Sequence, residues 1–128
     1  MNKVILTGNL CRDVEVKETQ NGKEVVSNSI AVKRDYKDSD GNYSSDFINF
    51  VAWGNQAKFL GNYAEKGDRI ELVGRWQVRS YEDQNGDKRT VNECLVENLS
   101  VFSKKEKTDR KEKNKPELEE VNADDLPF

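Results

Sequence analysis

The feature that most constrains the fold is a turn at residues 83–86 between two long strand-like segments, Arg69–Glu82 and Lys88–Phe102. The turn reads Asp-Gln-Asn-Gly, which is typical of a hairpin connection. In the first segment apolar and polar side chains alternate, and a period of two is typical of a strand with one buried face. We expect one set to be buried and the other to face solvent: Ile70, Leu72, Gly74, Trp76 and Val78 buried, and Arg75, Gln77, Arg79 and Tyr81 exposed.

Three earlier segments also have the alternation of strands: Lys3–Leu10, Glu24–Tyr36 and Asp46–Trp53. Residues 14–17 continue the first strand past a bend, and Asn21-Gly22 supplies the positive φ angles of a tight hairpin into the second. A polar loop at 37–45, with its turn at 40–42, leads to the third strand. The first half of the chain is therefore also predicted to be β-structure.

A single helix is predicted between the third and fourth strands, at Asn55–Glu65. Ala57, Leu60 and Ala64 recur at helical intervals, and Lys66-Gly67 supplies a C-terminal stop. The resulting order, β-β-β-α-β-β over about 100 residues, is that of a five-stranded oligonucleotide-binding barrel. The predicted fold class is therefore all-β, with one short helix and a disordered C-terminal tail.

Composition argues against an enzyme. The chain has no histidine, which excludes Ser-His-Asp and Cys-His nucleophilic devices, and it has no phosphate-binding loop or metal-ligand cluster. Cys11 and Cys94 are interpreted as packing residues, since two distant cysteines make neither a disulfide framework nor a zinc site. We expect no catalytic activity, no metal and no cofactor.

The charges are unevenly distributed along the chain. Residues 1–103 are slightly acidic, the segment 104–116 is rich in Lys and Arg, and 117–128 carry only acidic charges. From Ser103 onward apolar periodicity is lost, which predicts a barrel at 1–103, a charged disordered linker at 104–123 and a separate tip at 124–128. Neither an apolar run of about 18 residues nor a signal-peptide pattern is found, so we expect a cytoplasmic protein without a membrane partner.

Aromatic residues lie on both faces of the predicted third strand. Phe50 is assigned to the core by alternation, as is Trp76 in the fourth strand. Phe47 and Trp53 share the opposite face, about 20 Å apart at the rise of a strand, and Tyr81 shares a face with polar residues; pattern alone leaves core packing and base stacking equally open. Four basic residues are candidate phosphate contacts, although pattern alone favours solvated surface charges: Lys3, Lys17, Lys33 and Arg34.

The chain resembles the bacterial and phage single-stranded DNA-binding protein family through NKVILTGNL (2–10), DFINFVAWG (46–54), QVRSYEDQNG (77–86) and the terminal DDLPF. The resemblance implies a barrel that binds single-stranded DNA without strong sequence preference and assembles as a homo-oligomer, usually of four barrels; dimer or tetramer stays open. Val14, Asn28 and Trp76 depart from the family pattern. Matching positions supply stacking residues and basic or polar contacts: Tyr36, Phe47, Trp53 and Tyr81; Lys3, Lys17 and Arg79, with Asn9 and Arg75.

The chain ends in an acidic and apolar tip: Asp124, Asp125, Leu126, Pro127 and Phe128. The resemblance implies that this tip docks replication, recombination and repair proteins, for which a basic-rimmed hydrophobic pocket would be the physical complement. Two alternatives remain: an RNA-binding protein with the same barrel, and an adaptor of a replication-restart or recombination complex whose barrel face binds protein.

Overall fold

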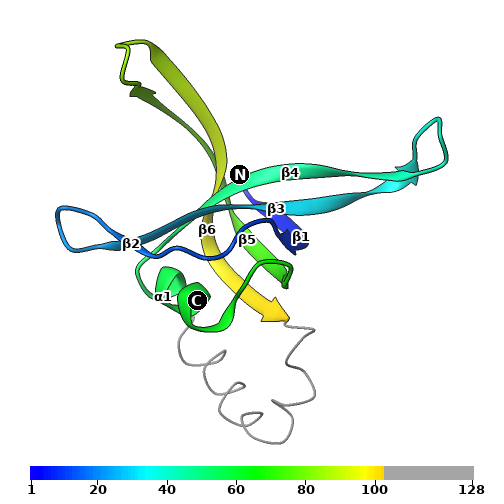
Figure 1. Ribbon diagram of the computed structural model, residues 1–128, viewed down its shortest axis with the longest axis horizontal. Helices are drawn as coiled ribbons and strands as arrows, with labels where there is room; N and C mark the ends of the chain where they lie inside the picture. Colours follow the sequence, from blue (N-terminus) through cyan, green and yellow to red (C-terminus); the bar gives the residue numbers. More distant parts are fainter. Residues whose placement is uncertain (103–128) are drawn as a thin grey trace, which may run out of the picture.

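A computed structural model describes residues 1–102, which form six strands and one helix (Figure 1). The elements follow in the expected order: β1 Val4–Leu10, β2 Lys17–Glu18, β3 Glu24–Lys37, β4 Tyr43–Trp53, α1 Asn55–Tyr63, β5 Arg69–Glu82 and β6 Lys88–Phe102. The five longer strands form a closed barrel with α1 between β4 and β5, which confirms the predicted fold class. The predicted linker and tip lie outside the described residues.

The barrel closes because β1 pairs with two strands. Along most of its length β1 is antiparallel to β5, and its last residues pair with β3 through Leu10 opposite Ile30. At this closure a Cβ on Gly8 would lie 2.5 Å from the carbonyl oxygen of Ala31, so the close approach requires glycine. A short parallel pairing of Phe50 with Cys94 joins β4 to β6 and completes the ring.

The predicted extension of the first strand is shorter than expected. The sequence placed it at 14–17, whereas β2 consists of Lys17–Glu18 and pairs with the beginning of β3. Between β1 and β2, the Asn28 side-chain amide of β3 donates to the carbonyls of Arg12 and Asp13 at 3.0 and 3.4 Å. Asn28 is polar although buried, and its amide provides a hydrogen-bond donor for two carbonyl groups of a loop that lies outside the strands.

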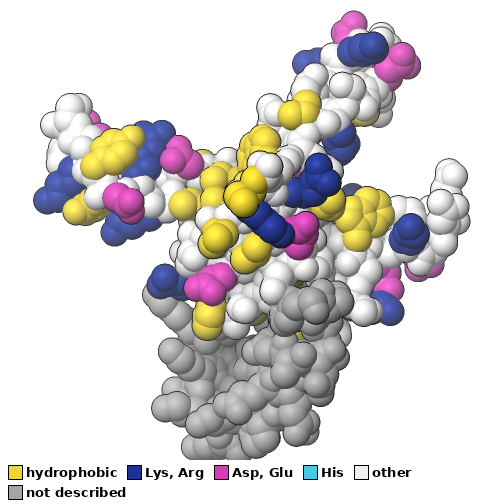
Figure 2. All heavy atoms as spheres, turned by 180° about the vertical axis from the view of Figure 1, so that it is seen from behind, with side chains coloured by type: hydrophobic (Ala, Val, Ile, Leu, Met, Phe, Trp, Pro, Cys, Tyr) yellow, Lys and Arg dark blue, Asp and Glu magenta, His cyan; other side chains and the backbone are white. Residues whose placement is uncertain are grey.

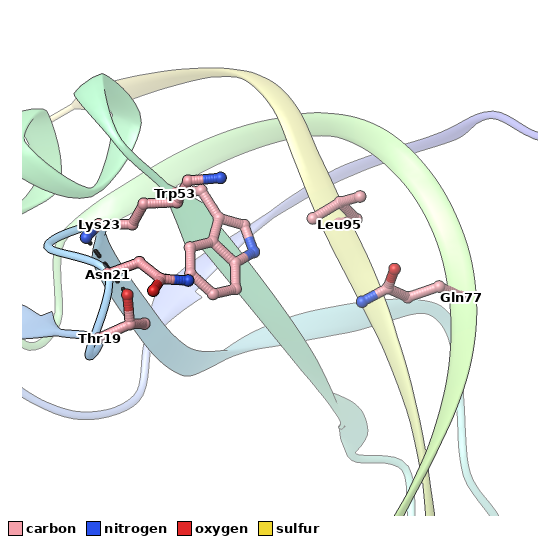
Figure 3. A pocket seen from close by; sticks show the side chains of 6 residues that line it. All are labelled: Thr19, Asn21, Lys23, Trp53, Gln77 and Leu95. Atoms are coloured by element: carbon pink, nitrogen blue, oxygen red, sulfur yellow. Dashed lines mark hydrogen bonds between the residues drawn. The ribbon is translucent and has the colours of Figure 1, made fainter.

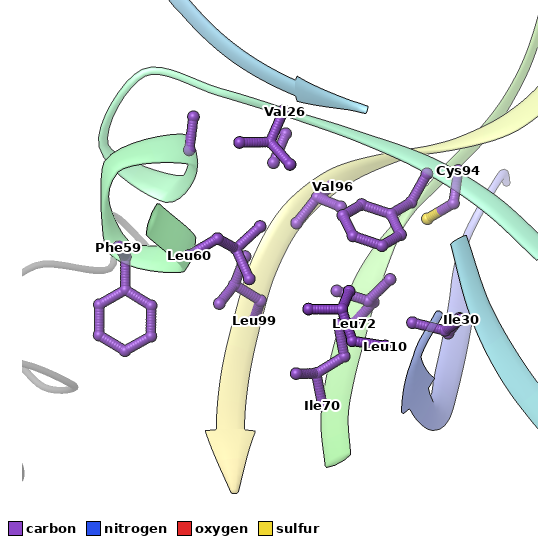
Figure 4. Packing of buried hydrophobic residues seen from close by; sticks show 13 residues of the cluster. Leu10, Val26, Ile30, Phe59, Leu60, Ile70, Leu72, Cys94, Val96 and Leu99 are labelled. Atoms are coloured by element: carbon purple, nitrogen blue, oxygen red, sulfur yellow. The ribbon is translucent and has the colours of Figure 1, made fainter. Parts of the chain in front are cut away.

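The core lies between the barrel walls and α1 (Figure 4). Its largest fully buried side chains come from all five long strands and the helix: Phe50, Leu10, Ile30, Leu60, Ile70, Leu72, Leu99, Val26 and Cys94. The helix packs Ala57 and Leu60 into this core, and its Phe59 ring lies 4.9 Å from that of Tyr63. Burial raises the pKa of the Cys94 thiol to about 11, which suits the predicted packing role, whereas Cys11 is only half-buried.

Three hairpins extend beyond the barrel, formed by β2–β3, β3–β4 and β5–β6 (Figure 1). In the β5–β6 hairpin, the predicted burial of Trp76 and Val78 is wrong, since their exposed fractions are 38% and 60%. Both residues lie on the expected face of β5, but they stand at the rim where the hairpin leaves the barrel, and that face is only partly covered there. The helix of residues 1–102, α1, is too short and too polar to cross a membrane.

Candidate nucleic-acid interface

Odd-numbered side chains of three adjacent strands share one surface, which we call the outer face. The even-numbered Phe50, Leu72 and Cys94 are buried inside the barrel, so their neighbours along each strand point outward. Register places Val51 of β4 opposite Leu95 of β6, and Glu93 of β6 opposite Gln77 of β5. The outer face comprises Tyr43, Phe47, Asn49, Val51 and Trp53 of β4; Arg75, Gln77, Arg79 and Tyr81 of β5; and Val91, Glu93 and Leu95 of β6.

Aromatic side chains remain accessible along the outer face. Phe47 is 72% exposed, Trp53 42% and Tyr81 46%, so three of the four predicted stacking residues share this surface. Tyr43, which is also exposed, extends the series into the β3–β4 hairpin. The sequence prediction missed Tyr43 because it began the strand at Asp46; the even spacing of Tyr43, Phe47 and Trp53, four and six residues, was the available signal.

A hollow of about 580 Å³ lies beside Trp53 (Figure 3). The turn between β2 and β3 contributes Thr19, Asn21 and Lys23 on one side, while Leu95 and Gln77 line the other side. Lys17 of β2 faces the same way, since it pairs with Val25, which in turn pairs with Trp53. One indole therefore has two lysines nearby, of which Lys23 was not predicted because it directly follows a turn.

Two lysines of the β3–β4 hairpin contact the Tyr43 ring. The Nζ atom of Lys33 lies 4.5 Å from the ring centroid and that of Lys37 lies 5.8 Å away. Lys33 is also a near neighbour of Phe47, because Ala31 pairs with Phe47 and Lys33 with Ser45. The predicted contact residue Lys33 thus sits between two exposed aromatic rings, an arrangement in which cation–π attraction holds the ammonium close to the ring.

Arg79 lies next to Tyr81 but is held by a buried carboxylate. Its Nε atom donates to Oε2 of Glu93 at 2.7 Å, and Nε2 of Gln77 donates to the same oxygen at 2.7 Å. Glu93 is only 3% exposed, and the hydrogen bond from the guanidinium to this carboxylate raises the pKa of Arg79. Within residues 1–102, Arg75 on the same face has no carboxylate within ion-pair distance.

Other predicted contact residues already have partners. The ion pairs are Lys3 with Glu97 at 2.5 Å, Lys17 with Glu15 at 3.6 Å, and Arg34 with Asp46 at 2.7 Å. Asn9 donates its side-chain amide to the carbonyl of Gly67 at 3.0 Å, which connects β1 to the segment before β5. The hydrogen bond between Arg34 and Asp46 lowers the pKa of Asp46 and raises that of Arg34.

Tyr36 stands apart from the other three predicted stacking residues. It is 64% exposed and lies beside Arg34, where it adds to the effect of Asp46 in raising the pKa of that arginine. Arg34 occupies an even position of β3 and pairs with Asp46, whereas Lys33 lies on the same side of the hairpin as Phe47. The structure therefore brings Phe47, Trp53 and Tyr81 onto one surface and places Tyr36 on the other side of the hairpin.

On the face seen in Figure 2, the charged side chains of residues 1–102 do not form a uniform patch. Figure 2 shows hydrophobic side chains over the middle of the body, with Lys and Arg close to them and acidic side chains interspersed. Binding that depended on bulk positive charge would require a broad basic surface. The arrangement is instead suited to a flexible polyanion whose flat groups can reach individual aromatic side chains.

Comparison with known proteins agrees with this geometry. Residues 1–102 match the model of the single-strand binding protein family. Single-stranded DNA-binding protein 1 of Streptococcus pyogenes is 35% identical over all of this chain and 99% of its own length. The single-stranded DNA-binding protein of Streptococcus pneumoniae is 39% identical over 80% of this chain and 65% of its own length. The chain therefore belongs to the single-strand binding protein family.

Proposed function

We propose that this chain binds single-stranded DNA on its outer face, without strong sequence preference. Bases stack on Phe47, Trp53 and Tyr81, and phosphates pair with cations between and beside these rings. The observation that carries the proposal is the exposure of three aromatic side chains on one continuous surface. The family match and the names of its relatives point to the same ligand.

The spacing of the aromatic residues fits an extended strand of nucleotides. Phe47 and Trp53 are six residues apart on one strand, which is about 20 Å at 3.3 Å per residue. A few nucleotides span that distance, with Lys33 near one ring and Lys17 and Lys23 near the other. Each stacked base contributes about 1 to 3 kcal/mol, and stacking accepts any base because every base has a flat face.

Single strands are favoured over duplex for a physical reason. Stacking on a side chain requires an unpaired base whose face is free, which a duplex does not offer. Duplex binding without sequence preference depends on many phosphate contacts, whereas residues 1–103 carry slightly more acidic than basic side chains. Lys3, Lys17 and Arg34 would also have to exchange a carboxylate partner for a phosphate.

The central experiment follows the fluorescence of one tryptophan. The variant Trp76→Phe leaves Trp53 as the single tryptophan of the chain, and titration with oligo-dT at low salt should quench its emission. A duplex of equal length is the matched control, and an abasic strand with the same phosphates separates stacking from charge pairing. Absence of quenching by oligo-dT at low salt would contradict the proposal.

We also propose that the tip at 124–128 recruits replication, recombination and repair proteins while the linker at 104–123 gives it reach. The acidic pair Asp124 and Asp125 beside Phe128 suits a hydrophobic pocket with a basic rim. Removing 124–128 should preserve oligo-dT affinity and abolish capture of such proteins, identified by mass spectrometry. A loss of DNA affinity would argue against separate roles for barrel and tip.

Self-association is part of the proposal and has a specific structural support. Trp76 and Val78 are apolar, adjacent on one face of β5 and exposed in the single chain. Such a face is more stable when a second copy covers it. Light scattering of the wild type and of Trp76→Ser, each with and without poly-dT, should show a larger particle for the wild type; equal masses would contradict this role for Trp76.

Two other ligands make different predictions. An RNA-binding protein would prefer an RNA oligomer over the matched DNA, because it would contact 2′-hydroxyl groups. An adaptor whose barrel face binds protein would keep its DNA affinity when Trp53 is replaced by alanine. Competition between matched DNA and RNA oligomers, and the Trp53→Ala titration, therefore distinguish these alternatives from the proposed function.

A further inference from the structure

Glu93 combines two properties that rarely occur together in a single side chain. Its odd position on β6 directs it to the outer face, opposite Gln77 of β5, yet only 3% of it is exposed. A buried carboxylate is stable only when charged or polar donors surround it. Here Arg79 and Gln77 both donate to it at 2.7 Å, so the three side chains form one unit, which we call the Glu93 cluster.

The Glu93 cluster lies within the candidate interface. Gln77 lines the hollow beside Trp53, and the guanidinium carbon of Arg79 lies 5.9 Å from the centroid of the Tyr81 ring. About half of the Arg79 side chain is exposed, so N–H groups that do not contact Glu93 remain available to a ligand. The amide nitrogen of Gln77 is engaged by Glu93, which leaves its carbonyl oxygen for a donor.

The electrostatic consequence differs from that of an unpaired arginine. Glu93 is buried and accepts two hydrogen bonds at 2.7 Å, so Arg79 keeps its counter-charge when a ligand arrives. An arginine that stays paired does not replace salt cations on a phosphate, whereas a free cation does. The family resemblance implied that Arg79 is a basic contact, yet its geometry is that of a fixed donor beside an aromatic ring, with its positive charge balanced by Glu93.

We propose that Glu93 is a positioning residue that makes Arg79 a salt-insensitive contact for bases, rather than a phosphate ligand. Glu93 fixes the guanidinium plane next to Tyr81, where it extends the stacking surface and offers hydrogen-bond donors to base edges. Salt-dependent affinity then comes from other cations, such as Arg75. This inference rests on the proposed binding of single-stranded DNA.

The test is the slope of log affinity against log salt concentration, measured by anisotropy of labelled oligo-dT. A free cation that contacts a phosphate on a single strand contributes about 0.7 to the magnitude of this slope. Arg75→Gln should therefore make the slope shallower by about 0.7. Glu93→Gln, which keeps the side-chain shape but frees the Arg79 charge, should make it steeper by about 0.7, or about fivefold in affinity per tenfold change in salt.

The double variant Glu93→Gln with Arg79→Gln provides the matched control. It removes both charges together and leaves no uncompensated carboxylate in the barrel wall, so it remains usable if a single variant is unstable in thermal melts. We expect weaker binding at every salt concentration with the slope of the wild type. Two results would overturn the inference. One is a slope of the double variant that is shallower than that of the wild type by the same amount as in Arg75→Gln. The other is a slope of Glu93→Gln that equals that of the wild type.

The same titrations separate this inference from the proposed function. Wild-type protein that fails to bind oligo-dT overturns both. Wild-type protein that binds normally, combined with slopes that contradict the expectation for the Glu93 variants, overturns only the role of Glu93. A purely structural role for Glu93 would change thermal stability without changing the slope.

Discussion

The strand β5 passes through two regions in which the same alternation of side chains has opposite results. In the barrel, Ile70 and Leu72 are fully buried within the core. In the hairpin, Trp76 and Val78 lie on the same side of the strand and are exposed. Alternation therefore determines which face a side chain occupies, while burial depends on whether a second layer covers that face.

The largest effect that can test this comparison is on stability. Replacing Phe50, which is 1% exposed, by alanine should reduce the free energy of unfolding by about 3 to 5 kcal/mol, since it leaves a cavity in the barrel. The matched variant Trp76→Ala should cost less, about 2 kcal/mol, because 38% of Trp76 is already in water and its removal leaves no closed cavity. Urea unfolding followed by far-ultraviolet circular dichroism measures both.

The result that would refute the comparison is a loss for Trp76→Ala as large as that for Phe50→Ala. Such a loss would mean that the hairpin is a structural part of the core. Repeating the titrations at several protein concentrations separates the stability of the single chain from any contribution of self-association.

DNA binding should depend on which face of the strand a side chain occupies rather than on how deeply it is buried. Trp53→Ala on the outer face should weaken oligo-dT binding about 5- to 150-fold, the equivalent of one lost stack of about 1 to 3 kcal/mol. Trp76→Ala should change the affinity for a short oligomer much less, because Trp76 lies on the opposite face of its strand. Anisotropy titrations of the two variants give the ratio directly, and similar losses would place Trp76 in the interface.

Long, regular elements with clear turns were predictable from the sequence. Both β5 and β6 have the predicted bounds, because the Asp-Gln-Asn-Gly turn marks where one ends and the other begins. Phe47 and Trp53 were assigned to a common face by their spacing, and register confirms that assignment. Their contact with DNA stays a prediction, as do the roles of the predicted cations and of the tip.

The errors have physical causes that a single sequence does not reveal. Trp76 was assigned to the core because alternation gives no information about where the barrel ends. Tyr43 was missed because a hairpin that extends beyond the barrel carries polar residues typical of a loop. The pairing of Arg79 with Glu93 depends on the register of two strands, which side-chain spacing along one strand cannot supply.

A third prediction concerns the point where the β2–β3 hairpin leaves the barrel. Asn28→Ala removes the donor to the carbonyls of Arg12 and Asp13, and we expect a loss of stability of about 1 kcal/mol. Hydrogen exchange of backbone amides at 11–16 should accelerate, because this loop connects β1 to β2. The adjacent exposed residue provides the control, Ser27→Ala, which should change neither quantity; unchanged exchange in Asn28→Ala would contradict the assigned role.

The smallest expected effect concerns the exposed arginine–carboxylate pair of the β3–β4 hairpin. Arg34 donates to both oxygens of Asp46 in the hairpin, where both side chains are open to solvent. This hydrogen bonding lowers the pKa of Asp46 below its ordinary value of 3.8. A lowered pKa in the folded state stabilises the protein above the unfolded value, and that stabilisation is lost as pH falls through the folded value. The melting temperature of the wild type should therefore slightly exceed that of Asp46→Asn at pH 7, and the difference should vanish once the pH lies below the lowered pKa of Asp46. A constant difference over this range would mean that Asp46 stabilises the hairpin by some means other than its charge.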